Sequence, residues 1–433
     1  MLTRVGYLGL GGARAVFWWL MGKVGGVDPA LWLNWKNIRY AVNQVSKTFS
    51  QAQNFSRSST GTFTNSALHI ALAAINDPRF TYVTRTRGLL NEEQRSTATN
   101  NLLEGAALGS NGTYPTGWSM TYNPGDWNVD VVGLGEEYGQ PYIDLRFHGN
   151  TVASEGILRF DKLGGVTADE AYTSSFYITK IAGSTDGIPV IDNRMSYYNS
   201  TFGYLSEGHT SILNKMDGER HMTAFTGTTP TDTGWCGAVL ALRASEVGRD
   251  ITLRIQLPQV EKGSFRTSHI LNGADTSTTR LGDKNDIILA DVGIDASKFS
   301  DGVTLYFEYE LLGDLSYNTI FELASDTYDD RIYAKTGGGT FRIIKGGAQT
   351  ANISVSPTIG KHKVAARLKD GDVAYYMDGV QIGTSAASIP TSLIKAYIGH
   401  YFDGTGQNAK VFYDGQIILS PLTNDECAEL TTL

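Results

Sequence analysis

The sequence is poor in cysteine, in charge and in long apolar runs. Its two cysteines, Cys236 and Cys427, stand far apart and show no CxxC or Cys/His spacing, so a structural zinc site is not expected. Isolated thiols are typical of reduced, buried side chains, and a disulfide between them is the alternative. Near the N-terminus, Arg14 and Lys23 bracket only eight apolar residues, whereas a helix needs roughly 20 to span a bilayer. We therefore expect no membrane insertion.

Charge is scarce and predominantly acidic. Charged residues make up 18% of the chain, the formal net charge is −8 and the isoelectric point is near 5.4. A surface that tracks nucleic acid needs clustered lysine and arginine to displace phosphate counterions, and the chain has no long basic run. Nucleic acid is therefore not expected as a partner.

The common catalytic signatures are also missing. The chain has no GxSxG, HExxH or Walker-A motif and no Cys/His nucleophile pattern. Hydrolysis of a glycosidic bond would need two carboxylates held a few ångströms apart. The acidic pairs that the sequence offers are direct neighbours: Glu92/Glu93, Glu136/Glu137 and Asp329/Asp330. Neighbours on a strand point to opposite faces, so none is itself a catalytic pair. We expect a protein that is not an enzyme and requires no cofactor.

The chain is rich in residues that favour strands and turns. It contains 49 glycines, 22 tyrosines and 17 phenylalanines, a composition typical of β-sheets joined by many turns. Strand-like alternation recurs without intervening helical patterns, at 128–134, 142–149, 174–183, 237–244 and 250–260. These short strands predict an antiparallel sandwich over residues 104–271.

A second β domain is predicted over residues 301–433. The segment 303–313 alternates strictly, with one face made of Leu305, Phe307, Tyr309 and Leu311. Three Asp-Gly pairs, at 370–371, 378–379 and 414–415, are hairpin signals, because Asp-Gly suits the two positive-φ positions of a type I′ turn. A short helix is expected at the C-terminus, with Thr423 as N-cap and Glu426 three residues later.

The N-terminal segment is unusually rich in tryptophan. Trp18, Trp19, Trp32 and Trp35 fall within 18 residues, a density that indicates a protein–protein interface. The alternative is packing onto the chain's own first domain. The spacing of apolar residues in 29–52 predicts a short amphipathic helix.

The predicted fold is all-β: two tandem antiparallel β-sandwich (jelly-roll) domains behind a partly helical N-terminal anchor. The predicted boundaries are 1–53 for the anchor, 54–103 for a connector, 104–271 for the first sandwich, 272–300 for a linker or edge element, and 301–433 for the second sandwich.

Three stretches resemble parts of bacteriophage tail and virion proteins. The connector, "FSRSSTGTF…NDPRFTY…RGLLNEEQRSTATNNLL", resembles a joint segment of that family, with an insertion at 96–100. "LPQVEKGSFRTSHI" resembles the segment that closes the jelly-roll module after the joint, with His269 in place of the usual aromatic residue. Residues 301–420 are similar to laminin-G/concanavalin-like sandwiches. The resemblance covers roughly residues 54–425.

The resemblance implies a virion structural protein, a tail fibre or spike. Its sandwich modules would bind host-surface polysaccharide or lipopolysaccharide without catalysis, it would be a homotrimer, and its N-terminus would contact other tail or capsid proteins. It would be made in the host cytoplasm and reside in the virion. Two alternatives stay open: an architectural head-fibre, decoration or tail-tip component without receptor binding, and a polysaccharide depolymerase.

Candidate glycan-binding residues come from the first sandwich. Aromatic side chains stack on the apolar face of a pyranose while polar groups satisfy its hydroxyls. Trp118, Tyr122, Trp127 and Trp235 are suitable, and the first three surround a Pro-Gly turn, as the rim of a binding loop would. The alternative is that the tryptophans seal the core of the sandwich.

A calcium site is the candidate in the second sandwich. Laminin-G-like domains often bind calcium at a sandwich rim, and Asp326, Asp329 and Asp330 offer carboxylates suited to a hard cation. The alternative is a solvated turn. Calcium is therefore a possible, not a required, ion.

The family setting places Glu92 and Glu93 at a joint. We expect them to pair with Arg87 and Arg95, within one chain or across a trimer. Exposed pairs of this kind contribute about 0–1 kcal/mol each, so their expected role is geometric.

Overall fold

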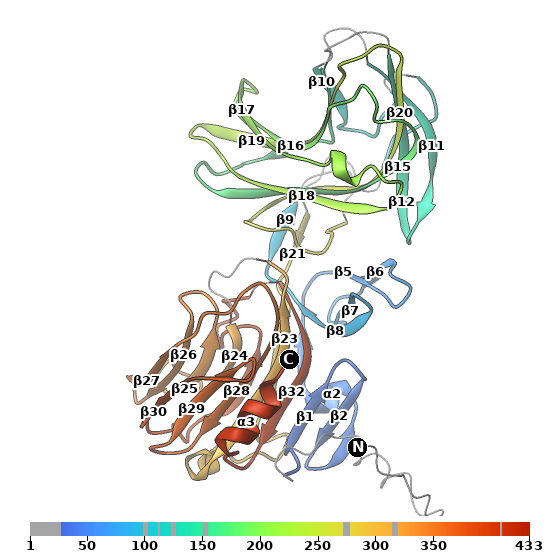
Figure 1. Ribbon diagram of the computed structural model, residues 1–433. Coiled ribbons are helices and arrows are strands. Elements are labelled where there is room, and N and C mark those ends of the chain that lie inside the picture. Colours follow the sequence, from blue (N-terminus) through green and yellow to red (C-terminus); the bar gives the residue numbers. More distant parts are fainter. Residues whose placement is uncertain are drawn as a thin grey trace, which may run out of the picture.

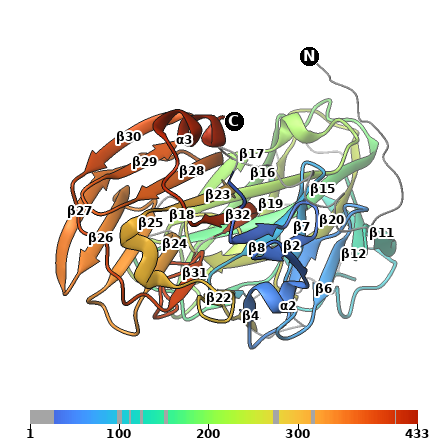
Figure 2. The ribbon, with the colours of Figure 1, turned by 90° about the horizontal axis from the view of Figure 1, so that it is seen from below.

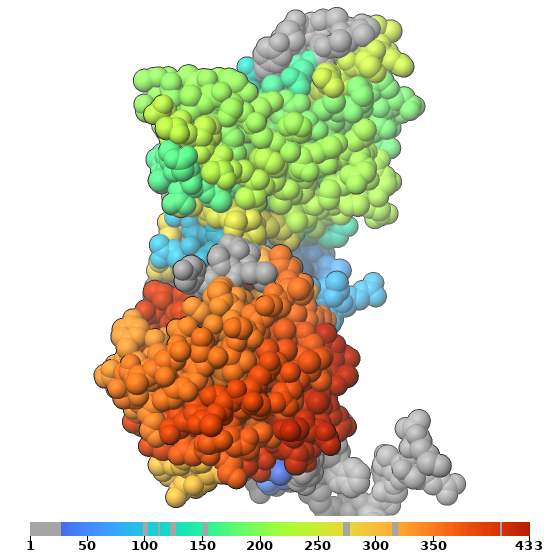
Figure 3. All heavy atoms as spheres, turned by 60° about the vertical axis from the view of Figure 1, so that its left-hand side comes forward, coloured from blue at the N-terminus to red at the C-terminus, as the bar shows by residue number. Residues whose placement is uncertain are grey.

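The computed structural model of the chain describes residues 27–97, 103–110, 113–122, 127–149, 155–271, 278–313, 319–407 and 409–433. These residues form two lobes stacked end to end, with a narrower neck between them (Figures 1 and 3). Each lobe is built from antiparallel strands in packed sheets, so the predicted all-β fold with tandem sandwiches is confirmed. Within these ranges, no helix combines the length and apolar character that crossing a lipid bilayer requires.

The first sandwich, the upper lobe of Figure 1, has two sheets. The first sheet contains β10 (Ser119–Tyr122), β13 (Glu155–Arg159), β19 (Thr233–Arg243), β16 (Val190–Asn199) and β17 (Tyr204–Ser211), with β14 (Leu163–Gly164) beside β19. The second contains β11 (Asn128–Glu137), β12 (Gln140–Gly149), β20 (Arg249–Lys262), β15 (Ala171–Gly183) and β18 (His221–Thr228). A 3-10 turn, η1 (Leu213–Lys215), connects β17 to β18.

The core of this lobe follows from the two-residue period of its strands. On β19, Cys236, Ala238, Leu240 and Leu242 belong to the buried cluster, and β20 adds alternate residues from Ile251 onward. Each of the five predicted strand segments lies on one of the observed strands. The alternation that was visible in the sequence therefore marks the side chains that fill the space between the sheets.

The second sandwich, the lower lobe, also has two sheets. One contains β3 (Val45–Lys47), β2 (Arg39–Val42), β1 (Leu31–Asn34), β32 (Lys410–Ile418), β23 (Val303–Leu311), β28 (Gly360–Leu368), β29 (Val373–Met377) and β30 (Val380–Ser385). The other contains β27 (Ala348–Ser354), β26 (Thr340–Lys345), β25 (Arg331–Lys335), β24 (Thr319–Ala324), β31 (Lys395–Ile398), β22 (Lys284–Ile288) and β4 (Asn54–Ser56). A 3-10 helix, η2 (Ala296–Asp301), precedes β23.

Two of the three Asp-Gly signals lie in hairpin loops. Asp378 and Gly379 both have positive φ, 52° and 83°, and join β29 to β30 as the predicted two-residue turn. The loop at 370–371 is longer, and only Gly371 has positive φ there. The prediction at 414–415 is wrong, because both residues lie inside β32. A Cβ on Gly415 would come within 3.0 Å of the Trp35 ring, so glycine there makes room for a tryptophan.

The first described strands belong to the second sandwich and not to a separate anchor. β1 pairs with β32, Leu31 opposite Ile417, and Figure 2 shows the blue strands beside the C-terminal ones. Trp32 and Trp35 are 3% and 0% exposed, and the Trp32 indole donates to Asp414 at 2.9 Å. The prediction that these two tryptophans form a virion anchor is therefore wrong. The other two predicted anchor residues, Trp18 and Trp19, lie outside the described residues.

The amphipathic helix predicted over 29–52 is replaced by β1, β2, β3 and one helical turn, α2 (Phe49–Ala52). The helical spacing was misleading because two of its apolar positions, Ile38 and Val45, are 62% and 57% exposed. Asn43 and Gln44 have positive φ and turn the chain from β2 into β3. Ladder bonds to β32 therefore determine the conformation, rather than the apolar period.

The predicted C-terminal helix is confirmed as α3 (Asn424–Thr431), where Thr423 and Glu426 form a capping box. Both cysteines are free and buried, Cys236 in the core of the first sandwich and Cys427 on the buried face of α3, so the two do not form a disulfide. Burial raises the pKa of the Cys427 thiol to about 11, which keeps it protonated and unreactive near neutral pH.

The neck is made by the predicted connector together with part of the predicted linker. β7 (Phe80–Val83) and β8 (Thr86–Asn91) join the second sandwich through β32, whereas β9 (Arg95–Thr97) pairs with β20 of the first. β5 (Gly61–Thr64) and β6 (Ile70–Ala73) form a separate hairpin beside it. β21 (Thr278–Arg280) pairs with β9, and β22 enters a sheet of the second sandwich, so these linker residues are structured.

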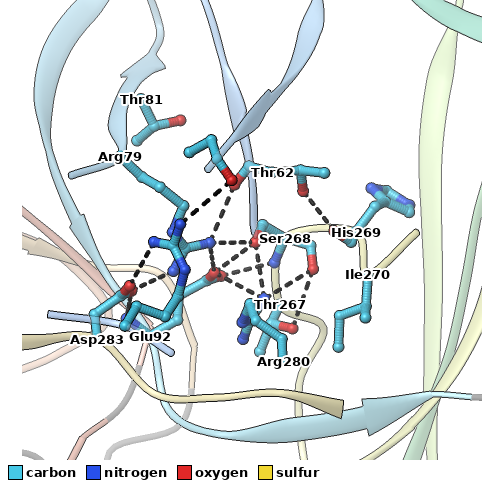
Figure 4. A network of polar contacts seen from close by, with 12 residues as sticks. Thr62, Arg79, Thr81, Glu92, Thr267, Ser268, His269, Ile270, Arg280 and Asp283 are labelled. Atoms are coloured by element: carbon cyan, nitrogen blue, oxygen red, sulfur yellow. Dashed lines mark hydrogen bonds and ion pairs between the residues drawn. The ribbon is translucent and has the colours of Figure 1, made fainter. Parts of the chain in front are cut away.

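Five buried charged side chains interlock inside the neck (Figure 4). Arg79 Nη1 lies 2.6 Å from Glu92 Oε2, and the other terminal nitrogen of Arg79 contacts Asp283. Arg57 approaches Asp283 at 3.0 Å, and Arg280 approaches Glu92 at 3.0 Å. Burial alone would raise the pKa of Glu92, but Arg280 and Arg79 lower it to about 2. We name these five residues the neck cluster.

The pairing predicted for the two glutamates is correct for one and wrong for the other. Glu93 contacts Arg95, as expected. Arg87 instead donates to the backbone oxygen of Trp35 at 2.6 Å and lies over the Phe80 ring. The predicted exposed character is wrong for Glu92, which is 2% exposed. Its ion-pair partners come from segments that are distant in sequence, so Glu92 connects parts of the neck and is not an exposed residue on its surface.

Candidate functional site

One face of the β10-β13-β19-β16-β17 sheet points away from the sandwich core. Residues directly opposite each other in antiparallel strands share a face. Arg159, Val239 and Arg194 are aligned in this way across β13, β19 and β16. The central strand β19 contributes only small or compact residues in the middle of this face, at Gly237, Val239 and Ala241, and longer side chains stand on the strands beside it. This arrangement produces a hollow over β19.

The hollow is a groove of about 740 Å³. Its walls are mixed, with hydroxyl, charged and aromatic side chains: Ser119, Thr121, Glu155, Ile157, Arg159, Ser196, Tyr198, Tyr204 and Glu207. We name it the open-face groove. It is large enough for one or two sugar rings and lies within the usual volume range of ligand pockets, about 300–1,000 Å³.

Two tyrosines stand at one end of the open-face groove. The rings of Tyr198 and Tyr204 lie edge to face with centroids 6.1 Å apart, and Tyr204 is 60% exposed. They oppose each other across β16 and β17 next to a register shift. The tight turn between them is held by Asn199, whose side-chain oxygen accepts from the backbone nitrogens of Thr201 and Gly203. A rigid turn thus presents an aromatic surface to solvent.

A charged group is centred on the buried Arg194, whose partners Glu155 and Glu207 line the groove. Arg194 bonds Glu207 through Nη1 at 2.8 Å and Glu155 through Nη2 at 2.6 Å, and Asp192 approaches Nη2 at 3.1 Å. Burial alone would lower the pKa of Arg194, but these carboxylates raise it. Arg194 therefore stays charged and fixes Glu155 and Glu207, each 25% exposed, with oxygen atoms available for further hydrogen bonds.

A second aromatic group adjoins the tyrosine end. Trp235 is the strand partner of Tyr198 and therefore faces the same side. Its ring packs on Phe202 at 4.6 Å, and Lys162 Nζ lies 3.6 Å from the Phe202 ring centroid. Gly164 is required beneath this tryptophan, because a Cβ there would approach the indole to 2.4 Å. The open face thus carries two aromatic pairs, Tyr198 with Tyr204 and Trp235 with Phe202.

The structure separates the four predicted glycan-binding residues. Trp127 and Trp118 are 1% and 6% exposed and belong to the core, so the prediction that they form a rim is wrong and the core alternative is confirmed. Trp118 packs on Phe160 at 4.6 Å. Tyr122 ends β10, and its side chain lies outside the described residues. Trp235 alone of the four is placed on the open face.

Sequence reasoning missed Tyr198, Tyr204, Arg159 and Arg194. The signal was present in residues 194–198, where Arg, Ser and Tyr alternate with the buried Met195 and Tyr197. Alternation of this kind marks one polar face of a strand. We attended instead to tryptophans near a Pro-Gly turn, and residue type alone does not distinguish a core tryptophan from a binding one.

The three aspartates predicted to bind calcium lie in the turn between β24 and β25. The Asp330 carboxylate accepts from Gly346 N at 2.8 Å and contacts the Ser392 hydroxyl, and Asp329 accepts from Thr327. Within the described ranges, no group of three or more His, Cys, Asp and Glu side chains is arranged to hold a metal. The carboxylates of Asp329 and Asp330 thus take part in hydrogen bonds within the protein, and calcium binding by the three aspartates stays a prediction.

No protein-family model and no curated protein sequence matches the chain. Among solved structures, the sialidase CBM40 domain of Ruminococcus gnavus, bound to α2,3-sialyllactose, aligns with 30% of this chain and 83% of its own, at 14% identity and TM-score 0.27. Domains LG4-5 of the mouse laminin α1 chain align with 59% and 84%, at 13% identity and TM-score 0.22. The tripod of the bacteriophage Tuc2009 baseplate aligns with 64% and 97%, at 13% identity and TM-score 0.26. These are distant similarities of fold.

Proposed function

We propose that this chain binds a host-surface glycan, without catalysis, as a tail fibre or spike of a bacteriophage virion. The observation that carries the binding proposal is the open-face groove, where Tyr198 and Tyr204 stand beside the fixed Arg194–glutamate group. Exposed tyrosine rings suit the apolar face of a pyranose, and carboxylate, hydroxyl and guanidinium groups suit its hydroxyls. The groove is open at the surface, which suits a chain end or an internal stretch of a polysaccharide.

The virion part of the proposal is supported by the connector sequence and its place in the fold. Residues 54–103 resemble a phage joint, and the neck that they build links two sandwiches end to end (Figure 1). A fibre needs modules in a fixed orientation, and the neck cluster would supply it. We further propose a homotrimer, attached to other virion proteins through residues preceding the described part of the chain, which include Trp18 and Trp19.

We expect the double variant Tyr198→Ala/Tyr204→Ala to lose at least about tenfold in affinity for the glycan, because aromatic pairs contribute about 0.5–1.5 kcal/mol each beyond their buried area. Binding is measured on an array of bacterial surface polysaccharides and quantified by calorimetry. The matched control is Tyr328→Ala, which removes a tyrosine that is 57% exposed on the second sandwich. Equal loss in the control variant would place binding outside the groove.

Two further outcomes would replace the proposal. If the intact protein binds no fraction of any host envelope, the architectural alternative holds. If it releases reducing ends from a host polysaccharide, it is a depolymerase.

A further inference from the structure

We propose that the open-face groove selects an anionic glycan and that Arg159, assisted by Lys162, receives its carboxylate or phosphate group. This inference rests on the proposed function and specifies its substrate class. It starts from Arg159, an arginine in the groove wall that forms no ion pair with any side chain in the part of the chain that the structure describes.

Arg159 differs from the other arginine of the groove. Arg194 is paired with three carboxylates. Arg159, by contrast, forms no ion pair with any side chain of the described residues. Its Nη2 donates to Ser119 Oγ at 3.1 Å, and its guanidinium lies 5.9 Å from the Tyr198 ring centroid. Its Nε is buried and has no hydrogen-bond partner in the same set of residues. A guanidinium has five N–H groups in a planar fork, so donors remain for a ligand.

Lys162 adds a second cation at the same end. Its Nζ lies over the Phe202 and Trp235 rings, 3.6 and 5.3 Å from their centroids. Burial lowers the pKa of Lys162, and repulsion from Arg159 lowers it further, whereas Asp161 opposes this. The Asp161 carboxylate accepts from the backbone nitrogen of Lys162 at 2.7 Å and forms no ion pair with Nζ. Two cations that repel each other beside a groove are stabilised when an anion binds between them.

The backbone of β19 makes room for the Arg159 side chain. A Cβ on Gly237 would lie 3.1 Å from Arg159 Cδ and 2.8 Å from the backbone oxygen of Asp161. Glycine at this position allows Arg159 to extend along the floor of the groove toward Tyr198. The packing of the Arg159 side chain on β19 therefore determines where its guanidinium lies.

The charges in the groove are separated in space. The cations Arg159 and Lys162 accompany Tyr198 and Trp235, whereas Glu155 and Glu207 surround Arg194. A sugar acid would therefore bind with its anionic group at Arg159, its ring against the tyrosines and its hydroxyls toward the glutamates. A neutral sugar would leave Arg159 without a counterion and could not form the bidentate pair that a guanidinium makes with a carboxylate or phosphate.

The test uses the full chain and matched glycan probes. The carboxylate arm compares oligogalacturonate with its methyl ester, which has the same sugar rings without the charge. The phosphate arm compares a mannose-6-phosphate oligosaccharide with the unphosphorylated form. We expect the protein to bind at least one anionic probe about tenfold or more tightly than its neutral partner, with an affinity that falls as salt rises. The arm that shows the preference identifies the anionic group.

Variants assign the preference to Arg159. Arg159→Gln is expected to remove the roughly tenfold preference, because the anionic probe loses much more affinity than the neutral probe does, and Arg159→Lys should restore part of the preference. Lys162→Gln should reduce it by a smaller factor. The control is Arg146→Gln, which removes an exposed arginine that pairs with Asp250 on the other sheet. Circular dichroism confirms that each variant is folded.

Three results would overturn the inference: equal affinity of the native protein for both members of each pair, a preference that survives Arg159→Gln, or equal loss for charged and neutral probes in that variant. Failure of the proposed function looks different. In that case no probe of either kind binds, and the double tyrosine variant behaves like the native protein.

Discussion

Replacing Glu92 with alanine is expected to lower the free energy of unfolding by about 3–5 kcal/mol, because it breaks a buried ion network, takes from Arg280 its ion-pair partner and leaves Arg79 with Asp283 alone. The Glu92 carboxylate forms ion pairs with Arg79 and Arg280, and it also accepts a hydrogen bond from the backbone nitrogen of Ser268 at 2.7 Å. These partners come from three separate segments of the neck (Figure 4). Chemical denaturation gives the free energy, and limited proteolysis reports whether the neck opens.

The adjacent residue provides the control for this prediction. Glu93 has one arginine partner and a side chain that is 31% exposed. Glu93→Ala is therefore expected to change the free energy of unfolding by about 0–1 kcal/mol. The two variants remove the same chemical group one position apart. If both variants have equally small effects, the neck cluster does not hold the lobes together.

The difference between these neighbours could not be predicted from the sequence. The stretch "RGLLNEEQR" suggests nearby partners, and for Glu93 the nearby Arg95 is correct. The partner of Glu92 at Arg280 is brought in by the pairing of β21 with β9. That contact spans most of the first sandwich in sequence, so no local pattern signals it. Local charge patterning predicts exposed pairs, whereas a buried cluster depends on topology.

The same distinction explains which parts of the fold were predictable. Strands with one buried face are visible as a two-residue period, and the five segments named in the first sandwich and the segment 303–313 in the second correspond to observed strands. Other strands of both sandwiches, such as β16 and β24, were not predicted. The first strands of the second sandwich were not found, because β1 is paired with β32 from the other end of the chain. The burial pattern of Leu31–Asn34 is continuous, so it contains no alternation to recognise. Strands in the interior of a sheet are easily taken for other elements when only their spacing is known.

The sequence predicted the type of candidate site, but it did not predict which residues would form it. A sandwich module with surface aromatics was expected, and Trp235 lies on the face that carries the groove. Trp127 was misplaced because its ring fills the space above Gly156, where a Cβ would approach it to 2.7 Å. Whether an aromatic side chain fills the core or reaches a ligand depends on the face of the sheet on which it lies. A strand's register determines that face, and register depends on partners that the local sequence does not name.

A last prediction concerns His269, a buried histidine near the end of the segment 257–270. The ring is buried and stacks on Tyr177 with centroids 5.4 Å apart. Burial lowers the pKa of His269 to about 3, assisted by the positive charges of Arg266 and Arg220, while Glu92 and a backbone hydrogen bond at Leu257 oppose the shift. Its Nε2 has no hydrogen-bond partner among the described residues. The folded protein therefore holds this histidine neutral.

The sign of the resulting pH dependence follows from proton uptake. In the unfolded chain His269 takes up a proton near its ordinary pKa of 6.5, whereas in the folded protein it does so only near 3. The contribution of neutral His269 is thus complete above pH 6.5. It decreases by about 1.4 kcal/mol per pH unit as the pH falls toward 3. Glu92 adds to this loss only below its ordinary pKa of 4.5. Between pH 4.5 and 6.5 Asp414, whose pKa burial raises to about 8, contributes a slope of the opposite sign, so the share of His269 is the difference between the native protein and a variant that lacks the histidine.

His269→Phe should therefore flatten the dependence of unfolding free energy on pH between 4.5 and 6.5, because phenylalanine keeps the stack on Tyr177 and does not titrate. Denaturant unfolding at a series of pH values measures this. His400, whose pKa burial also lowers, is expected to leave a residual slope in the same direction. An unchanged slope in His269→Phe would show that His269 is solvated or protonated in the folded protein. A flattened slope would mean that His269 makes the junction of the two sandwiches sensitive to mild acid and that the substitution removes this sensitivity.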